Sequence, residues 1–178
     1  MQLVFNLILV LLISNSQYYE CSNGKVIFES RSNLEKIVST SNELKGVINP
    51  ESNTFGFSID LNSFHGFNSQ LQKNHYQENY VESHKYPKAT FTGKIIEDIN
   101  YQQEGVYEVR AKGYFELHGM KINKIMNAKL TVVNEKFIHI SSNFLLNLKE
   151  FNIKVPRLVH KKVAENIYVE VDLDLNKK

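Results

Sequence analysis

The chain has 178 residues, which suits one domain, and its hydrophobic fraction of 42% and charged fraction of 22% are ordinary for a globular protein. The 21 Lys and Arg residues and 19 Asp and Glu residues give a net charge of +2 without a long basic run, which argues against nucleic-acid binding. The single cysteine excludes an internal disulfide.

The amino-terminal segment differs in composition from the rest of the chain. Residues 3–13 are apolar except for one Asn, and no charged side chain precedes Ser16. This apolar run is shorter than the about 20 residues that span a bilayer, and it suits the hydrophobic region of a signal peptide. Ser14 and Ser16 place small residues at −3 and −1. We therefore predict a signal peptide at 1–16, cleaved after Ser16, and an exported domain at 17–178, periplasmic or secreted. An uncleaved anchor is the alternative, because no Lys or Arg precedes the run.

Alternation of apolar and polar residues dominates the chain after this leader. For example, Phe55, Phe57 and Ile59 alternate with Gly56 and Ser58. A period of two predicts strands with one apolar and one solvated face, as in antiparallel sheets. Strands are predicted near residues 24–30, 44–49, 54–61, 89–99, 107–117, 121–133, 136–150 and 167–175.

These long amphipathic strands need protection for the edges of their sheet. Closing the sheet into a barrel removes the edges, and eight strands enclose an interior that side chains fill or that holds one small ligand. The sequence therefore predicts an all-β fold, an antiparallel eight-stranded barrel, with one or two short helices at the barrel ends.

One segment interrupts the alternation. Ser69 and Gln72 fit a capping box, with Asn68 as an alternative cap, and the following residues to about 81 have helical spacing. We predict a short helix there, over one end of the barrel, and a second short helix or turn at 157–164.

Catalytic and metal-binding motifs are not evident. His65, His75 and His118 could meet in space, but no pair of histidines has the spacing of a helical metal site. The sequence has neither a Gly-x-Ser-x-Gly elbow nor a Gly-rich phosphate loop between a strand and a helix. We therefore expect no enzyme activity, no catalytic residues, no metal and no cofactor. A metal-dependent or redox enzyme is kept as an alternative.

Four blocks of sequence go beyond the general pattern. They resemble the YceI-like family of lipocalin-like proteins, whose signature combines an aromatic helical excursion, a Tyr-Pro-x-Ala-x-Phe strand entry, a glycine-bounded hairpin and a late aromatic strand. The matching segments are SFHGFN at 63–68, YPKATFTGKI at 86–95, GYFELHG at 113–119 and FLLNLKEFNI at 144–153.

This resemblance implies an exported bacterial barrel that holds a polyisoprenoid or another long lipid. The expected partner is that apolar ligand, with transient membrane contact and no nucleic acid; the sequence leaves the oligomeric state open. The alternative is a packed barrel that serves as a structural or protein-interaction module without a ligand.

Residues for a ligand site follow from the alternation alone. The predicted barrel lining is Phe55, Phe57, Ile59, Phe91, Val109, Phe115, Leu130, Ile140, Phe144, Leu146, Val169 and Val171. Aromatic residues near the predicted helix are expected at the barrel mouth, namely Phe64, Phe67, Tyr76 and Tyr80.

Overall fold

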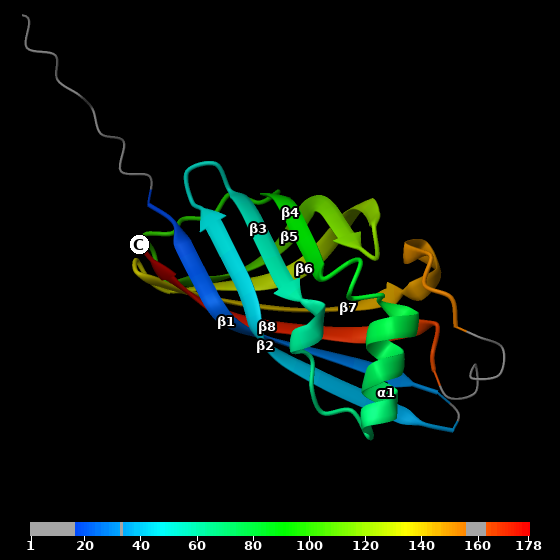
Figure 1. Cartoon of the computed structure of the whole chain (residues 1–178). Coiled ribbons are helices and arrows are strands. Elements are labelled where there is room, and N and C mark those ends of the chain that lie inside the picture. Colours follow the sequence, from blue (N-terminus) through cyan, green and yellow to red (C-terminus); the bar gives the residue numbers. More distant parts are fainter. Residues whose placement is uncertain (1–16, 33, 156–162) are drawn as a thin grey trace, which may run out of the picture.

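The computed structural model describes residues 17–32, 34–155 and 163–178, and it shows a closed antiparallel barrel (Figure 1). Each strand pairs with the next in the chain, and β8 pairs with β1 to close the sheet. This arrangement confirms the predicted fold class. The strands are β1 (Tyr19–Arg31), β2 (Lys36–Asn49), β3 (Thr54–Asp60), β4 (Lys88–Ile95), β5 (Gly105–Leu117), β6 (Met120–Asn134), β7 (Phe137–Asn147) and β8 (Asn166–Lys177).

The bounds of several strands differ from the prediction. β1 and β2 form a hairpin that extends well beyond the predicted ranges, from Tyr19 opposite Ile48 to Arg31 opposite Lys36. The sequence did not predict the full length of these two strands, because polar residues on the outer face of the hairpin weaken the strand signal. The predicted strand at 136–150 is too long, because β7 ends at Asn147 and the 3₁₀ helix η3 (Leu148–Phe151) follows. The Asn147 side chain accepts a hydrogen bond from Lys149 N and so begins that turn.

The predicted helix at 69–81 is present as α1 (Gln70–His75) and the continuous π-helical turn η2 (Tyr76–Tyr80). Ser69 is the N-cap, and its hydroxyl accepts a hydrogen bond from Gln72 N at 3.2 Å. The Gln72 side chain closes the reciprocal bond one residue earlier than in a standard capping box, because it accepts from Asn68 N. In Figure 1, α1 lies at the end of the barrel opposite the carboxyl terminus.

Two predicted segments fall largely or wholly outside the described residues: the leader at 1–16 and most of the second helix at 157–164. No helix among the described residues is long and apolar enough to cross a membrane. A further 3₁₀ turn, η1 (Leu61–Ser63), connects β3 to the segment that precedes α1.

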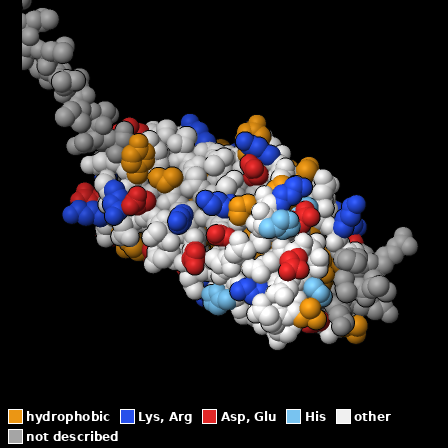
Figure 2. Space-filling model, in the orientation of Figure 1, with side chains coloured by type: hydrophobic (Ala, Val, Ile, Leu, Met, Phe, Trp, Pro, Cys, Tyr) orange, Lys and Arg blue, Asp and Glu red, His pale blue; other side chains and the backbone are white. Residues whose placement is uncertain are grey.

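Charged side chains are scattered over the face of the barrel that Figure 2 shows. On the face shown in Figure 2, acidic and basic groups are interspersed and hydrophobic side chains form small separate groups. This distribution follows from the strand period, which sends alternate residues outward into solvent and inward into the core.

Two buried tyrosines close the barrel end that lies away from α1. The rings of Tyr19 and Tyr101 stack with centroids 5.6 Å apart, and Tyr19 is fully buried. The Tyr19 hydroxyl donates to the carbonyl of Glu135, between β6 and β7, at 2.7 Å. Burial, together with the Glu135 carboxylate, raises the pKa of Tyr19, which keeps this donor protonated.

Tyr19→Phe is therefore expected to lower the free energy of unfolding by about 1 kcal/mol, because a part-buried hydrogen bond is lost. Urea unfolding checks this result. Tyr18→Phe is the matched control, since Tyr18 is 40% exposed on the opposite face of the strand. Equal midpoints for the two variants would contradict a stabilising role for the Tyr19 hydrogen bond.

Candidate functional site

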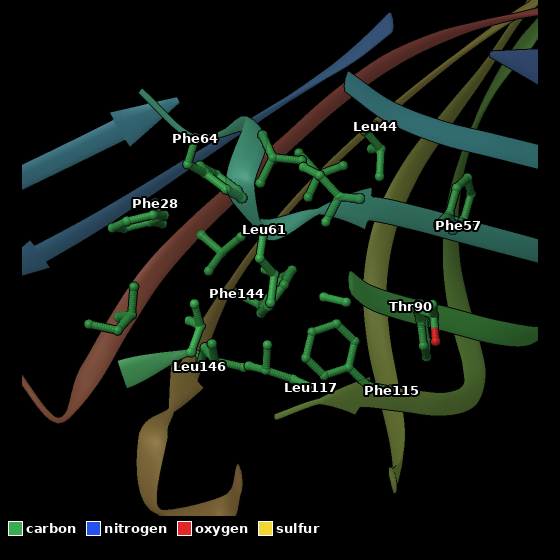
Figure 3. A pocket seen from close by; sticks show the side chains of 18 of the residues that line it. Phe28, Leu44, Phe57, Leu61, Phe64, Thr90, Phe115, Leu117, Phe144 and Leu146 are labelled. Atoms are coloured by element: carbon green, nitrogen blue, oxygen red, sulfur yellow. The ribbon is translucent and has the colours of Figure 1, made fainter. Parts of the chain in front are cut away.

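An apolar cavity of about 250 Å³ lies inside the barrel, between the tyrosine-closed end and α1. Figure 3 shows Phe28 and Phe64 toward one end of the cavity and Phe57 toward the other, with Phe115, Phe144 and Leu146 directed into the space between. Native cores leave few voids larger than a water molecule, so a space of this size is a departure from ordinary packing. It makes the cavity the leading candidate for a functional site.

Most residues of the predicted lining contact this cavity. They come from β3, β4, β5, β7 and β8, where the inward face of each strand continues the alternation. They are Phe57, Ile59, Phe91, Phe115, Ile140, Phe144, Leu146, Val169 and Val171.

Phe55, Val109 and Leu130 are buried but do not line the cavity. They lie in the part of the core where side chains fill the barrel. Phe55 packs on Phe57 and Phe91 with ring centroids 5.4 and 4.9 Å apart, and Leu130 has no exposed surface. The strand period predicts which face of a strand points inward. It does not predict which part of the barrel interior is filled by side chains and which part is a cavity.

All four predicted mouth residues line the cavity, at its α1 end. They form an aromatic cluster with Phe28 of β1, which the prediction missed. The Phe28 ring lies 5.1 Å from Phe64 and 5.4 Å from Tyr76, while Phe67 lies 5.1 Å from Tyr76. The fourth, Tyr80, is one helical turn beyond Tyr76.

The lining is almost entirely apolar. Among the described residues that line the cavity, none carries a charged side chain. Its polar side chains include Ser30, which accepts from Ala164 N at 2.9 Å, Ser142, which donates to the Asn127 carbonyl at 2.6 Å, and Gln72, which donates to Glu35 at 2.9 Å. These groups are satisfied by the protein, so the site suits a hydrocarbon better than an ion.

Strands β6 and β7 separate along one side of the cavity. Their pairing extends only from Lys129 opposite Ser141 to Asn134 opposite Phe137. Beyond that register the side chains of the two strands line the cavity instead. An ion pair between Lys124 of β6 and Glu150 of η3 bridges the outer part of this separation. The cavity therefore extends between two strands that pair normally elsewhere.

Two of the histidines, His118 and His65, make contacts that support the fold. His118 places its Nδ1 2.9 Å from the Phe151 carbonyl and its Nε2 2.8 Å from the Glu82 carboxylate. The backbone of His65 pairs with Thr40. The possible meeting of His65, His75 and His118 does not occur, since the described residues form no group of three or more His, Cys, Asp or Glu side chains able to hold a metal.

Several lining residues were not identified from the sequence. Val26, Phe28, Leu44, Leu61, Met126 and Ala128 belong to the same inward faces or to the turn after β3. The alternation of Val26, Phe28 and Ser30 within the predicted strand at 24–30 was the signal that could have found Phe28. Met126 gave a weaker signal, because its strand alternates less regularly in hydrophobicity.

Comparison with solved structures shows the same barrel in proteins of low sequence identity. A polyisoprenoid-binding domain from Saccharophagus degradans superposes with a TM-score of 0.74 at 15% identity, covering 90% of this chain and 98% of that one. BcnA of Burkholderia cenocepacia gives 0.66 at 14% identity, covering 85% and 95%. A YceI protein of Campylobacter jejuni gives 0.60 at 19% identity, covering 79% and 84%.

A search of curated proteins gave no match. Among models of protein families, the YceI-like domain matches residues 21–175, which is nearly the whole barrel from β1 to β8. The chain therefore belongs to the YceI-like family.

Proposed function

We propose that this chain is an exported binding protein that holds a long apolar lipid of the polyisoprenoid class inside its barrel. The observation that carries the proposal is the apolar cavity, whose described lining contains no charged side chain. The family is one of binding proteins rather than enzymes, and a relative of the same fold is described as a polyisoprenoid-binding domain.

Burial of hydrocarbon is sufficient to hold such a ligand. Each buried CH₂ group contributes about 0.8 kcal/mol, so a branched chain gains affinity with every unit that enters the cavity. The aromatic rings at the α1 end extend the apolar surface toward the outside of the barrel. A lipid held there is shielded from water during transfer through an aqueous compartment.

The size of the cavity supports occupancy. At about 250 Å³ it exceeds the roughly 150 Å³ cavity that stays dry and binds benzene in another protein. A longer chain needs outward movement of side chains or a part that extends past the aromatic cluster. The alternative of a packed barrel without ligand predicts no such space, so the cavity favours a binding protein.

Export and membrane contact are further parts of the proposal. The apolar segment at 3–13, with Ser14 and Ser16 before the cleavage point, supports a signal peptide that ends at residue 16. A carrier of insoluble lipid collects and delivers its ligand at membranes, so transient contact with a bilayer is expected.

Native mass spectrometry tests lipid binding and cleavage of the leader in one measurement. The full chain is expressed with its own leader, purified from the exported fraction without detergent, and weighed before and after organic extraction. We expect protein that begins at Gln17 and carries a long-chain prenyl or acyl species at one molecule per barrel. A failure to bind any of a panel of prenyl and acyl lipids would make the packed-barrel module the better reading, and an intact leader would overturn cleavage.

A further inference from the structure

The Tyr76 hydroxyl is a polar group in the described cavity lining that the apolar character of the lining does not explain. Tyr76 begins η2, and its ring packs against Phe28, Phe64 and Phe67. Among the described residues, no group makes a hydrogen bond with its hydroxyl. A phenol placed among hydrocarbon without a partner is unusual, because buried polar groups are normally paired.

The Tyr76 oxygen is not fully enclosed by the protein. Among the described residues, every sealed side-chain nitrogen or oxygen atom has a hydrogen-bond partner. The unpartnered Tyr76 oxygen is therefore not sealed, although its ring is surrounded by other aromatic rings and lines the cavity. The side chain that carries this oxygen is therefore within reach of a ligand in the cavity.

The phenol acts as a neutral hydrogen-bond donor. Burial, with a smaller contribution from the Asp60 carboxylate, raises the pKa of Tyr76 far above its ordinary value. The O–H group therefore keeps its proton at any ordinary pH and can donate one hydrogen bond. The three phenylalanine rings hold the Tyr76 ring in place, which lowers the entropy cost of making that bond.

The electrostatic surroundings restrict the acceptor. The described lining has no cation to neutralise a phosphate, and the charge that acts on the Tyr76 hydroxyl is the negative one of Asp60. An anionic group beside Tyr76 would lose its hydration without a counter-ion, at a high cost. An uncharged oxygen, such as that of an alcohol or a carbonyl, meets no such penalty.

We propose that Tyr76 determines specificity by donating a hydrogen bond to an uncharged oxygen of the lipid, so that the barrel selects a neutral, singly oxygenated long-chain ligand over its phosphorylated and hydrocarbon counterparts. This inference rests on the proposed lipid-binding function and narrows its ligand class.

Tyr80 is the competing donor. It also lines the cavity at the same end, and its hydroxyl likewise has no hydrogen-bond partner among the described residues. Burial raises the pKa of Tyr80 as well. However, three aromatic rings pack against Tyr76, whereas none among the described residues packs against Tyr80. Water can satisfy a hydroxyl in that position, which makes Tyr76 the group with more to gain from a ligand.

The experiment compares three probes on the mature protein: geranylgeraniol, geranylgeranyl diphosphate and the corresponding hydrocarbon without the hydroxyl group. Dissociation constants are measured for the wild type, Tyr76→Phe, Tyr80→Phe and Tyr107→Phe. The last is a matched control, because the Tyr107 side chain lies outside the cavity and its hydroxyl contacts the Asn100 carbonyl.

We expect the wild type to prefer the alcohol over both other probes. Tyr76→Phe should weaken binding of the alcohol about 3- to 10-fold, the effect of one neutral hydrogen bond, and leave binding of the hydrocarbon within about 2-fold. Tyr107→Phe should change neither. An unchanged preference in Tyr76→Phe, a loss confined to Tyr80→Phe, or tightest binding of the diphosphate would overturn the inference while leaving lipid binding intact. Failure of the wild type to bind all three probes would instead overturn the proposed function.

Discussion

Replacement of Phe144 by glutamate is expected to abolish ligand retention, with at least about a 100-fold loss of affinity. Phe144 is directed into the middle of the cavity, 6.3 Å from the Phe115 ring (Figure 3). A carboxylate there faces an apolar lining with no described cation to pair with. Its burial costs several kcal/mol, and a ligand that covers it removes its remaining contact with water. Mass analysis of the extracted lipid, with a lipid-binding titration, measures the loss.

Leu145→Glu is the control that separates this effect from general damage. Leu145 is the next residue on β7 and is 69% exposed on the outside of the barrel. The same charge one residue away should therefore leave retention and stability close to those of the wild type. Circular dichroism establishes that both variants are folded. A folded Phe144→Glu protein that retains its ligand would remove Phe144 from the binding site.

Replacement of Gly113 by alanine is expected to produce a large loss of stability, as is replacement of Gly93 opposite it. Gly113 of β5 lies opposite Gly93 of β4. A Cβ atom on Gly113 would lie 2.1 Å from the carbonyl oxygen of Thr92, and one on Gly93 would lie 2.1 Å from that of Lys112. Because the obstructing atoms are backbone, the two strands must separate to admit it. We expect a loss of about 3 kcal/mol or more in unfolding free energy.

Gly56→Ala provides the comparison within the same sheet. A Cβ atom on Gly56 of β3 would make ordinary contacts, with Val47 at 3.7 Å and Thr92 at 3.9 Å. Alanine there is expected to be neutral or slightly stabilising, since it reduces the freedom of the unfolded chain. Thermal unfolding should place Gly113→Ala roughly 6–12 °C below the wild type, at about 2–4 °C per kcal/mol for a domain of this size. Similar melting temperatures for the two variants would contradict the close approach of β4 and β5.

The strands were largely predictable because the strand signal is local. An inward residue at every second position appears in any short window, so Phe57, Ile59 and Phe91 could be assigned to one face without knowledge of their neighbours. The ends of the strands were less predictable. β1 and β2 continue through polar residues because each supplies the other's hydrogen bonds, which is a property of the pair.

The residues of the candidate site show the same difference between local signals, which the sequence reveals, and long-range contacts, which it does not. Tyr76 and Tyr80 were assigned to the barrel end from their place in the helical interruption, and both line the cavity there. Phe28 was missed, although it contacts three of the predicted mouth residues, because its partners lie in a segment far along the chain. The sequences of β6 and β7 do not indicate that these strands separate, because β6 remains paired with β5 and β7 remains paired with β8.

By itself the sequence determined the class of this protein: an antiparallel barrel with an apolar interior and an aromatic cluster beside a short helix. These properties depend on residues close together in the chain. Only the tertiary structure decided how much of the interior is filled. Tyr19 and Tyr101, 82 residues apart, close one end and bury Phe55 and Leu130 in solid packing, while the cavity opens farther along the same inward faces. The boundary between packed core and cavity depends on the combined volume of side chains from many distant segments. A local sequence pattern cannot predict that combined volume.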